Sequence, residues 1–436
     1  MSSSSALIPA LLKGGQSQAA GRVAAEALRA TFDLDVADLA FTQDEYSLNS
    51  VSGKVSLTDG RTFFFKFHHE EGEEENVTEY YRAQLLSDAG LPVEVPFAAS
   101  TVPGTQMVLY ELRREPRMAD VCADLERAWG AGATLPPRLL AARRALDART
   151  GEVMTETLRP AVASSAGAAI HQLFHHRLVD RSARALGGRY RAYYLEDPAF
   201  APLADKRWRV NGVEYRSTLA ELATQAMVLL APAALAALPV VTAHGDDHHG
   251  NVWVMDGRSP DDDKGPGNDA GGGLTSPPLA LTLRLFDPAF AGTDLPVLLA
   301  PVKATFHNAL AHPFWLYHPA EAAQRSTIEV DRSAEVVELT DDAHLSGLRR
   351  QVLDSAAELV RAPLLAELAR RSWLAGNWRA IVRSALFCCP TLVTNLTASH
   401  RSEPVRLMGL ARAVAAGSEP ASGSDEVSRF LDGVTP

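Results

Sequence analysis

The sequence has little of several features that mark particular classes of protein. Only three of its 436 residues are cysteine, which is too few for a disulfide framework. Cys388 and Cys389 are adjacent and precede Pro390, a spacing that does not suit a zinc site and is more typical of small buried side chains. No apolar run approaches the roughly 20 residues that cross a bilayer, and the Ser-rich start lacks the basic and apolar regions of a secretory signal. A reducing cytoplasm is therefore the expected location, with no membrane partner.

Positive charge is also scarce. Lysine and arginine number 42 against 53 aspartate and glutamate residues, for a formal net charge of −11. Because lysine and arginine supply most of the affinity for a phosphate backbone, this balance argues against nucleic-acid binding. The hydrophobic fraction of 46% and the charged fraction of 22% are those of a globular protein. A chain of this length can bury a large core, in one large domain or in two lobes.

The first part of the chain has mostly strand-like runs. The Asp59-Gly60 pair between two of them is a strong hairpin signal. Helical spacing of apolar residues predicts one helix before these runs and another among them. The predicted helices cover residues 16–32 and 79–86, and the predicted strands cover residues 45–50, 54–57, 62–68, 93–98 and 106–110.

From Arg113 onward the pattern becomes mostly helical. The predicted helices cover residues 138–147, 158–177, 218–237 and 344–388, and short strands are predicted at 240–243, 252–255 and 279–286. The prediction is an α+β fold with two lobes, a β-rich lobe at residues 1–112 and a mostly helical lobe at 113–436. A flexible insertion is expected at 257–278, rich in Gly, Asp and Pro, and loose ends at 2–5 and 417–436.

One segment carries most of the chemical information. Between two apolar runs, His244-Gly245-Asp246 is separated from Asn251 by four residues, and Asp287 ends another predicted strand. Phosphoryl transfer needs oxygen ligands for Mg²⁺ and a carboxylate that orients the accepting hydroxyl and takes its proton. Asp246 suits the role of the base, and Asn251 and Asp287 suit the metal. The spacing of Asp246 and Asn251 matches the catalytic loop of protein kinases.

This loop resembles that of the aminoglycoside phosphotransferase and choline kinase superfamily, whose fold is protein-kinase-like. In such loops the residue at His244 is similar to a structural histidine that braces the loop. Phe286-Asp287-Pro288-Ala289 differs from the Asp-Phe-Gly of protein kinases and resembles the metal-binding Asp-Pro segments of fructosamine and methylthioribose kinases. Asp294 is similar to a second acidic position that supports the loop. The resemblance implies ATP, Mg²⁺ and a small-molecule hydroxyl acceptor: a sugar, amino sugar or amino alcohol.

The first lobe is then expected to supply a lysine for the phosphates. Lys66 lies in the middle of the third predicted strand, flanked by aromatic residues, at the position of the kinase strand lysine. A charge in such surroundings needs a carboxylate partner. Glu79, thirteen residues on in the next predicted helix, resembles the partner glutamate of kinases, and Glu75 is the weaker candidate.

Two further segments would contact the nucleotide. Residues 49–53 are expected to form the phosphate-covering loop, with Ser50, Ser52 and backbone N–H groups near the phosphates, although Gly53 is its one glycine. Residues 107–112 resemble a kinase hinge, in which the backbone from Tyr110 to Leu112 would hydrogen-bond the adenine edge.

Other functions are also considered. His244 and the Asp246–His249 run could hold a dinuclear metal centre in a hydrolase, although no hydrolase spacing links them to other histidines and Lys66 would have no role. A pseudokinase that binds nucleotide without turnover is favoured only by the glycine-poor phosphate loop. Protein-kinase activity is disfavoured because no activation segment ending in Ala-Pro-Glu follows Asp287. His171, in the predicted helix 158–177, is expected to pack beside the catalytic loop, and the aromatic run 312–318 forms either core or the wall of an acceptor pocket.

Overall fold

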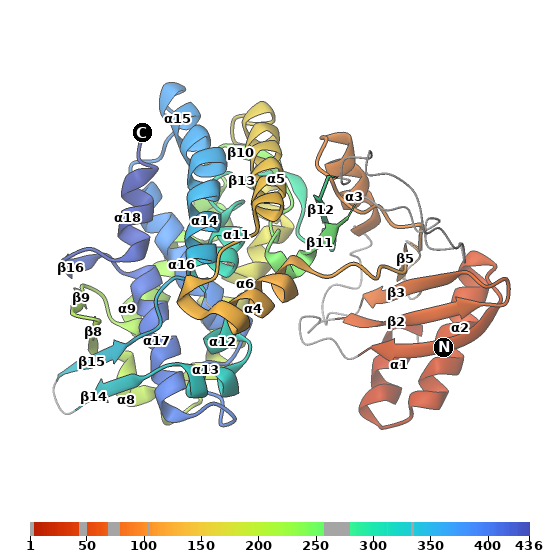
Figure 1. Ribbon diagram of the computed structural model, residues 1–436, viewed down its shortest axis with the longest axis horizontal. Coiled ribbons are helices and arrows are strands. Elements are labelled where there is room, and N and C mark those ends of the chain that lie inside the picture. The colour runs from red at the N-terminus through yellow and green to blue at the C-terminus, as the bar shows by residue number, and fades with distance from the viewer. Residues whose placement is uncertain are drawn as a thin grey trace, which may run out of the picture. The chain divides into compact units, whose positions relative to one another are not determined.

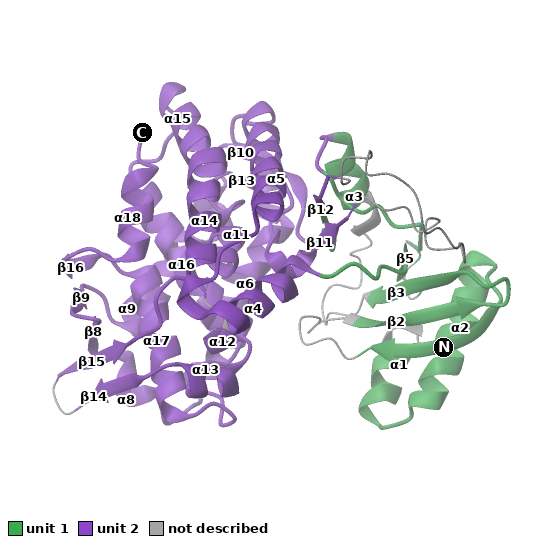
Figure 2. Ribbon diagram, viewed as in Figure 1, with its two compact units in different colours: residues 1–88, 92–116, 284–289 green, residues 89–91, 117–283, 290–436 purple. Residues whose placement is uncertain are grey.

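A computed structural model describes residues 4–42, 50–68, 79–100, 102, 105, 107–256, 280–311, 313–332 and 335–436 (Figure 1). The chain forms two compact units, each of which is described by itself. Unit 1 comprises residues 1–88, 92–116 and 284–289, and unit 2 comprises residues 89–91, 117–283 and 290–436 (Figure 2). Within the described residues, no helix is both long enough and apolar enough to span a bilayer.

Unit 1 is built on one antiparallel five-stranded sheet in the order β1-β2-β3-β5-β4. Its elements are α1 (Ser4–Lys13), α2 (Ser17–Phe32), β1 (Val36–Thr42), β2 (Ser50–Leu57), β3 (Thr62–His68), α3 (Glu79–Asp88), β4 (Ala98–Ser100) and β5 (Met107–Glu111). The hairpin between β2 and β3 turns at Gly60, whose φ of +89° favours glycine.

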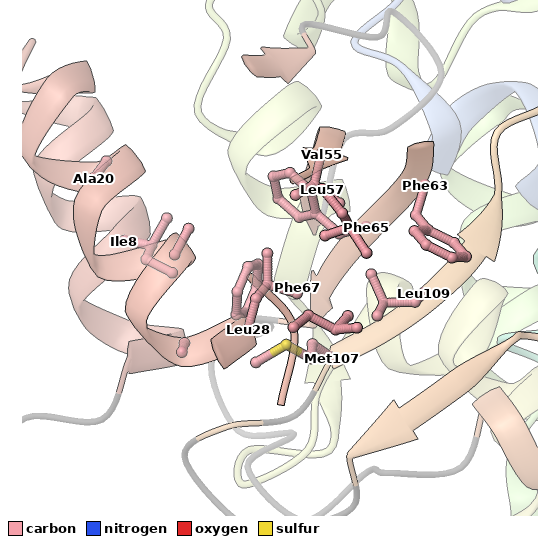
Figure 3. Close-up of a cluster of buried hydrophobic side chains, with 13 residues drawn as sticks. Ile8, Ala20, Leu28, Val55, Leu57, Phe63, Phe65, Phe67, Met107 and Leu109 are labelled. Carbon is pink, nitrogen blue, oxygen red and sulfur yellow. The ribbon is translucent and has the colours of Figure 1, made fainter. Parts of the chain in front are cut away.

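Alternation along β3 places the core of unit 1 on one face of the sheet and Lys66 on the other. Phe63, Phe65 and Phe67 are all buried and pack with apolar side chains of α1 and α2 in one cluster (Figure 3). Side chains at every second position of a strand point to the same face, so Lys66 lies on the opposite face of the sheet. The aromatic run thus anchors the strand while it presents a lysine on the other side.

A short distant segment completes unit 1. Residues 284–289 join it because Leu285 forms a parallel bridge with Val93. The Leu285 N–H donates to Pro92 O at 2.8 Å, and the Glu94 N–H donates to Leu285 O at 2.7 Å. The predicted division at residue 112 placed this segment in the helical lobe, and backbone pairing is the reason that it lies in unit 1 instead. Pairing of this kind over a long sequence separation cannot be read from local pattern.

Unit 2 is mostly helical, as the sequence predicted. Its α-helices are α4 (Met118–Trp129), α5 (Pro137–Glu156), α6 (His175–Leu178), α7 (Gly188–Tyr190), α8 (Ala201–Ala204), α9 (Leu219–Leu229), α10 (Pro232–Leu235), α11 (Val302–Thr305), α12 (Pro313–Leu316), α13 (Pro319–Arg325), α14 (Gly347–Ala356), α15 (Ala362–Arg370), α16 (Trp378–Val393), α17 (Glu403–Gly417) and α18 (Glu426–Gly433). Tighter 3₁₀ turns are η1 (Gly130–Gly132), η2 (Ala163–Gly167), η3 (Ala169–Leu173) and η5 (His249–Asn251), and π-helical segments are η4 (Arg191–Leu195), η6 (Phe306–Leu310) and η7 (Ala357–Arg361).

Unit 2 also contains a five-stranded sheet that the sequence analysis missed, in the order β14-β15-β8-β9-β16. The remaining strands form pairs: β6 with β7, β10 with β13, and β11 with β12. These strands are β6 (Val179–Asp180), β7 (Ala185–Leu186), β8 (Arg207–Val210), β9 (Val213–Tyr215), β10 (Val240–Ala243), β11 (Val252–Met255), β12 (Thr282–Leu285), β13 (Gly292–Pro296), β14 (Ile328–Asp331), β15 (Val336–Asp341) and β16 (Pro420–Ser422).

Several sequence predictions about the elements are wrong. The predicted helix at 158–177 is broken into η2, η3 and α6, and the predicted helix at 344–388 is interrupted after α15 at residues 371–377. The predicted loose tail at 417–436 is wrong, because Phe430 is buried in α18. Of the predicted loose start at 2–5, Ser4 and Ser5 are the described residues, and they begin α1. The predicted insertion at 257–278 and most of the predicted strand at 45–50 lie outside the described residues.

The adjacent cysteines behave as the sequence predicted. Cys388 and Cys389 are buried inside α16, which packs against α9 and α17. Burial raises the pKa of the Cys389 thiol to about 12, so it stays protonated at neutral pH. These thiols are core side chains.

Candidate active site

Unit 1 brings together two residues that the sequence analysis assigned to phosphate and metal. The Lys66 Nζ lies 2.5 Å from Asp287 Oδ1, although the residues are 221 positions apart in sequence. The lysine side chain is only 11% exposed, whereas the aspartate side chain is 36% exposed. Asp287 has a φ of +55°, an uncommon value for a residue other than glycine. Such outliers tend to cluster at functional sites.

The structure describes the backbone but not the side chain of Glu79, the expected partner of Lys66 in α3. Glu79 is the first residue of α3, but its side chain lies outside what the structure describes, as does Glu75. The observed ion pair of Lys66 with Asp287 was not predicted. The pairing with Glu79 stays a prediction.

The predicted phosphate loop is wrong in its local structure. Ser50, Ser52 and Gly53 all belong to the strand β2 rather than to a loop. Ser52 is buried, pairs with Lys66 in the β2–β3 register, and its Oγ lies 3.1 Å from Thr42 Oγ1. A Cβ on Gly53 would lie 2.3 Å from Ala40 O, so this glycine permits close strand packing. The connection from β1 to β2 covers residues 43–49, which lie outside the described residues.

The predicted hinge at residues 107–112 consists of the strand β5 and the residue after it. Tyr110 is buried in β5, where it pairs with Phe64 of β3, and Leu112 comes directly after the strand. Contact of their backbone with adenine stays a prediction.

In unit 2, the predicted catalytic loop follows the fully buried strand β10. Gly245 has a φ of +79°, and a Cβ there would lie 2.8 Å from Phe290 O, so the turn requires glycine. The Asp246 N–H donates to His244 Nδ1 at 3.3 Å. The Asn251 Nδ2 donates to Asp246 O at 2.9 Å. His244 therefore braces the loop, as the resemblance implied.

The Asp246 carboxylate is almost enclosed. Its side chain is 13% exposed, and its Oδ1 is buried with no hydrogen-bond partner among the described residues. Lys303 Nζ lies 3.8 Å from this oxygen and His248 Nε2 lies 3.9 Å from it. Burial raises the pKa of a carboxyl group, but the nearby charges of Lys303, His248 and His244 hold the pKa of Asp246 below its ordinary value. Asp246 is thus a carboxylate at neutral pH, as a proton acceptor must be.

Sequence reasoning missed Lys303. It lies in α11, four residues before His307, and both side chains are buried. Lys303 Nζ is 2.9 Å from His307 Nε2, and Tyr317 Oη is 2.8 Å from His307 Nδ1. The helical spacing of Lys303 and His307 is visible in the sequence, but no local signal links this pair to Asp246.

Two residues suit a magnesium ion by their chemistry. Asn251 uses its amide nitrogen to bind the backbone of Asp246, which leaves the amide oxygen as its ligand atom. Asp287 supplies a carboxylate in unit 1. A neutral amide oxygen and a carboxylate are the hard oxygen donors that Mg²⁺ prefers. The donor types therefore fit the predicted metal.

The histidines near Asp246 do not form a metal centre. Among the residues that the structure describes, no group of three or more His, Cys, Asp or Glu side chains is arranged to hold a metal ion. His248 Nδ1 accepts from the Gly250 N–H at 3.0 Å, and the His249 N–H donates to Asn308 Oδ1 at 2.6 Å. These bonds hold the loop in place, and no metal-binding group among the described residues supports the hydrolase alternative.

Neighbouring segments support the loop from outside. His171 is buried in η3, and its Nε2 lies 2.8 Å from Ser165 O. A Cβ placed on Gly245 would lie 3.5 Å from the Ile170 side chain. The segment therefore packs beside the catalytic loop as predicted, although as a 3₁₀ turn. Phe314 and Trp315 of the aromatic run are buried, so these two side chains belong to the core rather than to the wall of an acceptor pocket.

No protein-family model and no curated protein matches the sequence. Solved structures are similar to it at low identity. A spectinomycin phosphotransferase solved with ADP and spectinomycin matches 91% of this chain and 98% of its own, at 12% identity and a TM-score of 0.36. A microcompartment-associated aminopropanol kinase matches 91% and 95%, at 13% identity and a TM-score of 0.39. An amicoumacin kinase solved with AMP-PNP and Ca²⁺ matches 92% of each chain, at 14% identity and a TM-score of 0.36.

Proposed function

We propose that this chain is a small-molecule kinase that transfers the γ-phosphoryl group of ATP to a hydroxyl of its substrate. The observation that carries the proposal is the contact between Lys66 and Asp287 in unit 1. The sequence assigned these two residues to the phosphates and the metal independently, and the fold places their side chains together. Asp246, held as a carboxylate beside Asn251 in unit 2, supplies the remaining chemistry.

Each residue has a defined task in this reaction. Lys66 binds the α- and β-phosphates, and Asn251 and Asp287 are the ligands for magnesium. The bound Mg²⁺ neutralises negative charge on the phosphate oxygens. Asp246 orients the acceptor hydroxyl and takes its proton. The acceptor oxygen forms a bond to the γ-phosphorus, the bond from that phosphorus to the β,γ-bridging oxygen breaks, and ADP leaves with that electron pair.

The oxygen of Asp246 that takes the proton is Oδ2. Oδ1 is buried and faces Lys303 and His248, so a substrate hydroxyl has access to the exposed part of the side chain instead. An acceptor that carries hydroxyl groups, a sugar, amino sugar or amino alcohol, fits this chemistry. The formal net charge of −11 favours a neutral or cationic acceptor over an anionic one.

The test is ADP release from Mg·ATP in the presence of a panel of sugars, amino sugars and amino alcohols, with GTP tested in parallel. Asp246→Asn should lower turnover by about 10²- to 10⁴-fold, the usual contribution of a positioned general base. Lys66→Met should mainly raise the KM for ATP. The control is Asp124→Asn, because the Asp124 side chain is 75% exposed and pairs only with a surface arginine among the contacts described.

Two outcomes would contradict the proposal. Near wild-type turnover in Asp246→Asn would remove the assigned base. Tight Mg·ATP binding by the wild-type protein without transfer to any acceptor or to water would favour the pseudokinase alternative.

A further inference from the structure

The feature that carries a further inference is a buried lysine beside the proposed base. Lys303 is 3% exposed, and a buried ammonium group is costly unless nearby groups stabilise its charge. Its Nζ lies 3.8 Å from Asp246 Oδ1 and 2.9 Å from His307 Nε2. Lysine is one of the residue types that are almost never fully buried without a partner, so the position of Lys303 needs a specific reason.

The direction of the hydrogen bonds follows from the chemistry of the groups. An ammonium group has donors only, so His307 Nε2 must accept from Lys303. The imidazole is neutral, because burial and the charge of Lys303 hold the pKa of His307 well below its ordinary value. Its proton therefore lies on Nδ1 and is donated to Tyr317 Oη at 2.8 Å. The two hydrogen bonds that join Tyr317, His307 and Lys303 hold the ammonium group in one place.

The ammonium group is close to Asp246 without being hydrogen-bonded to it. A separation of 3.8 Å exceeds the 2.7–2.9 Å that is usual for a charge-assisted hydrogen bond. Asp246 Oδ1 is buried and has no hydrogen-bond partner among the described residues, and Lys303 Nζ at 3.8 Å and His248 Nε2 at 3.9 Å are the side-chain nitrogen atoms beside it. Oδ1 thus faces Lys303, which leaves the exposed part of the Asp246 side chain for the substrate.

We infer that Lys303 is a positioning residue for phosphoryl transfer, which acts through Asp246, and that His307 and Tyr317 hold it in place. This inference rests on the proposed kinase function. Lys303 keeps the base oriented, so its loss should impair the chemical step while nucleotide binding persists. Nothing in the loop motif itself supplies this group, because α11 lies far from the motif in sequence.

The experiment compares Lys303→Met with the wild-type protein. Methionine keeps most of the volume of the lysine stem but removes the charge. Turnover of Mg·ATP should fall by about 10- to 100-fold, part of the contribution of a positioned base, while the KM for ATP and the Kd for Mg·ADP change by less than about threefold. Lys303→Arg should recover part of the lost turnover. Lys206→Met is the matched control, because that lysine is on the surface of unit 2 and binds a backbone carbonyl.

A second variant covers the case in which Lys303→Met does not fold. Tyr317→Phe removes only the hydroxyl that is hydrogen-bonded to His307. This variant should lower turnover by about two- to fivefold at an unchanged KM for ATP. An unchanged turnover in a folded Lys303→Met variant would overturn the inference. A loss of turnover accompanied by an equal loss of nucleotide affinity would overturn it as well. If only Tyr317→Phe folds, an unchanged turnover in that variant would overturn it. A wild-type protein that neither binds nor turns over nucleotide would overturn the kinase proposal as well, so the two failures are distinguishable.

Discussion

The buried ion pair between Glu126 and Arg349 gives the sharpest prediction about stability. Glu126 in α4 is 1% exposed and Arg349 in α14 is 3% exposed. Arg349 donates from Nε to Oε1 at 2.9 Å and from Nη2 to Oε2 at 2.8 Å. Its Nη1 donates to the backbone carbonyl of Asn308 at 2.9 Å, and Ser346 Oγ donates to Glu126 Oε1 at 2.7 Å. The pair therefore links two helices to the segment that carries His307.

Arg349→Met removes the guanidinium and leaves the buried Glu126 carboxylate without that cation. Breaking a buried pair in this way costs about 3–5 kcal/mol. With a urea m-value of about 3 kcal/mol/M, the free-energy loss lowers the urea midpoint by about 1–1.7 M. The double variant Arg349→Met with Glu126→Leu should recover most of the loss, because an apolar pair of similar volume avoids the cost of burying charge.

The assay is urea unfolding followed by far-UV circular dichroism on the wild-type protein, both single variants and the double variant. The coupling free energy from this cycle should be about 3 kcal/mol or more, since the two side chains contact each other directly. A single variant that loses less than about 1 kcal/mol would refute the reasoning. Additive losses in the double variant would refute it equally.

Three further predictions concern the loop, the pH response and the C-terminal helix. Gly245→Ala should destabilise unit 2 by about 2–4 kcal/mol, because its Cβ meets Phe290 O in a left-handed conformation; an unchanged thermal midpoint would contradict this. The pKa of His307 is lower in the folded protein than in the unfolded chain. The contribution of neutral His307 to the free energy of unfolding is therefore complete above about pH 6.5. This contribution declines as the pH falls, because the unfolded chain then binds a proton that the folded protein does not. His307→Gln should therefore lose less stability than the wild-type protein between pH 7.5 and 5.5, measured by urea midpoints. Phe430→Ala should lower the free energy of unfolding by about 3–5 kcal/mol in the same assay. An unchanged free energy of unfolding would instead support a loose tail.

The parts of the site that the sequence predicted depend on short-range patterns. Asp246 and Asn251 lie in one loop between two buried strands, so their spacing alone fixes their relation. The position of Lys66 follows from strand alternation, and Asp287 follows from its place at the end of a predicted strand. The roles of these residues in transfer remain predictions for the experiments above.

The parts that could not be predicted depend on packing between distant segments. Lys303 reaches Asp246 only because α11 packs beside the catalytic loop. Gly53 was interpreted as a loop glycine, whereas its close contact with Ala40 shows that a missing side chain also serves strand packing. For α18 a local signal was present, since Val427, Phe430 and Leu431 have helical spacing and are buried, but the polar residues before them dominated the composition.

The way the chain is shared between the units has a practical consequence for protein engineering. The chain passes from one unit to the other five times, after residues 88, 91, 116, 283 and 289. A fragment that ends at residue 116 would lack Asp287, the ion-pair partner of Lys66, and Leu285, the bridge partner of Val93. Independent production of unit 1 would thus require grafting the hexapeptide 284–289 onto the fragment by a designed linker, since no single cut in the gene isolates it.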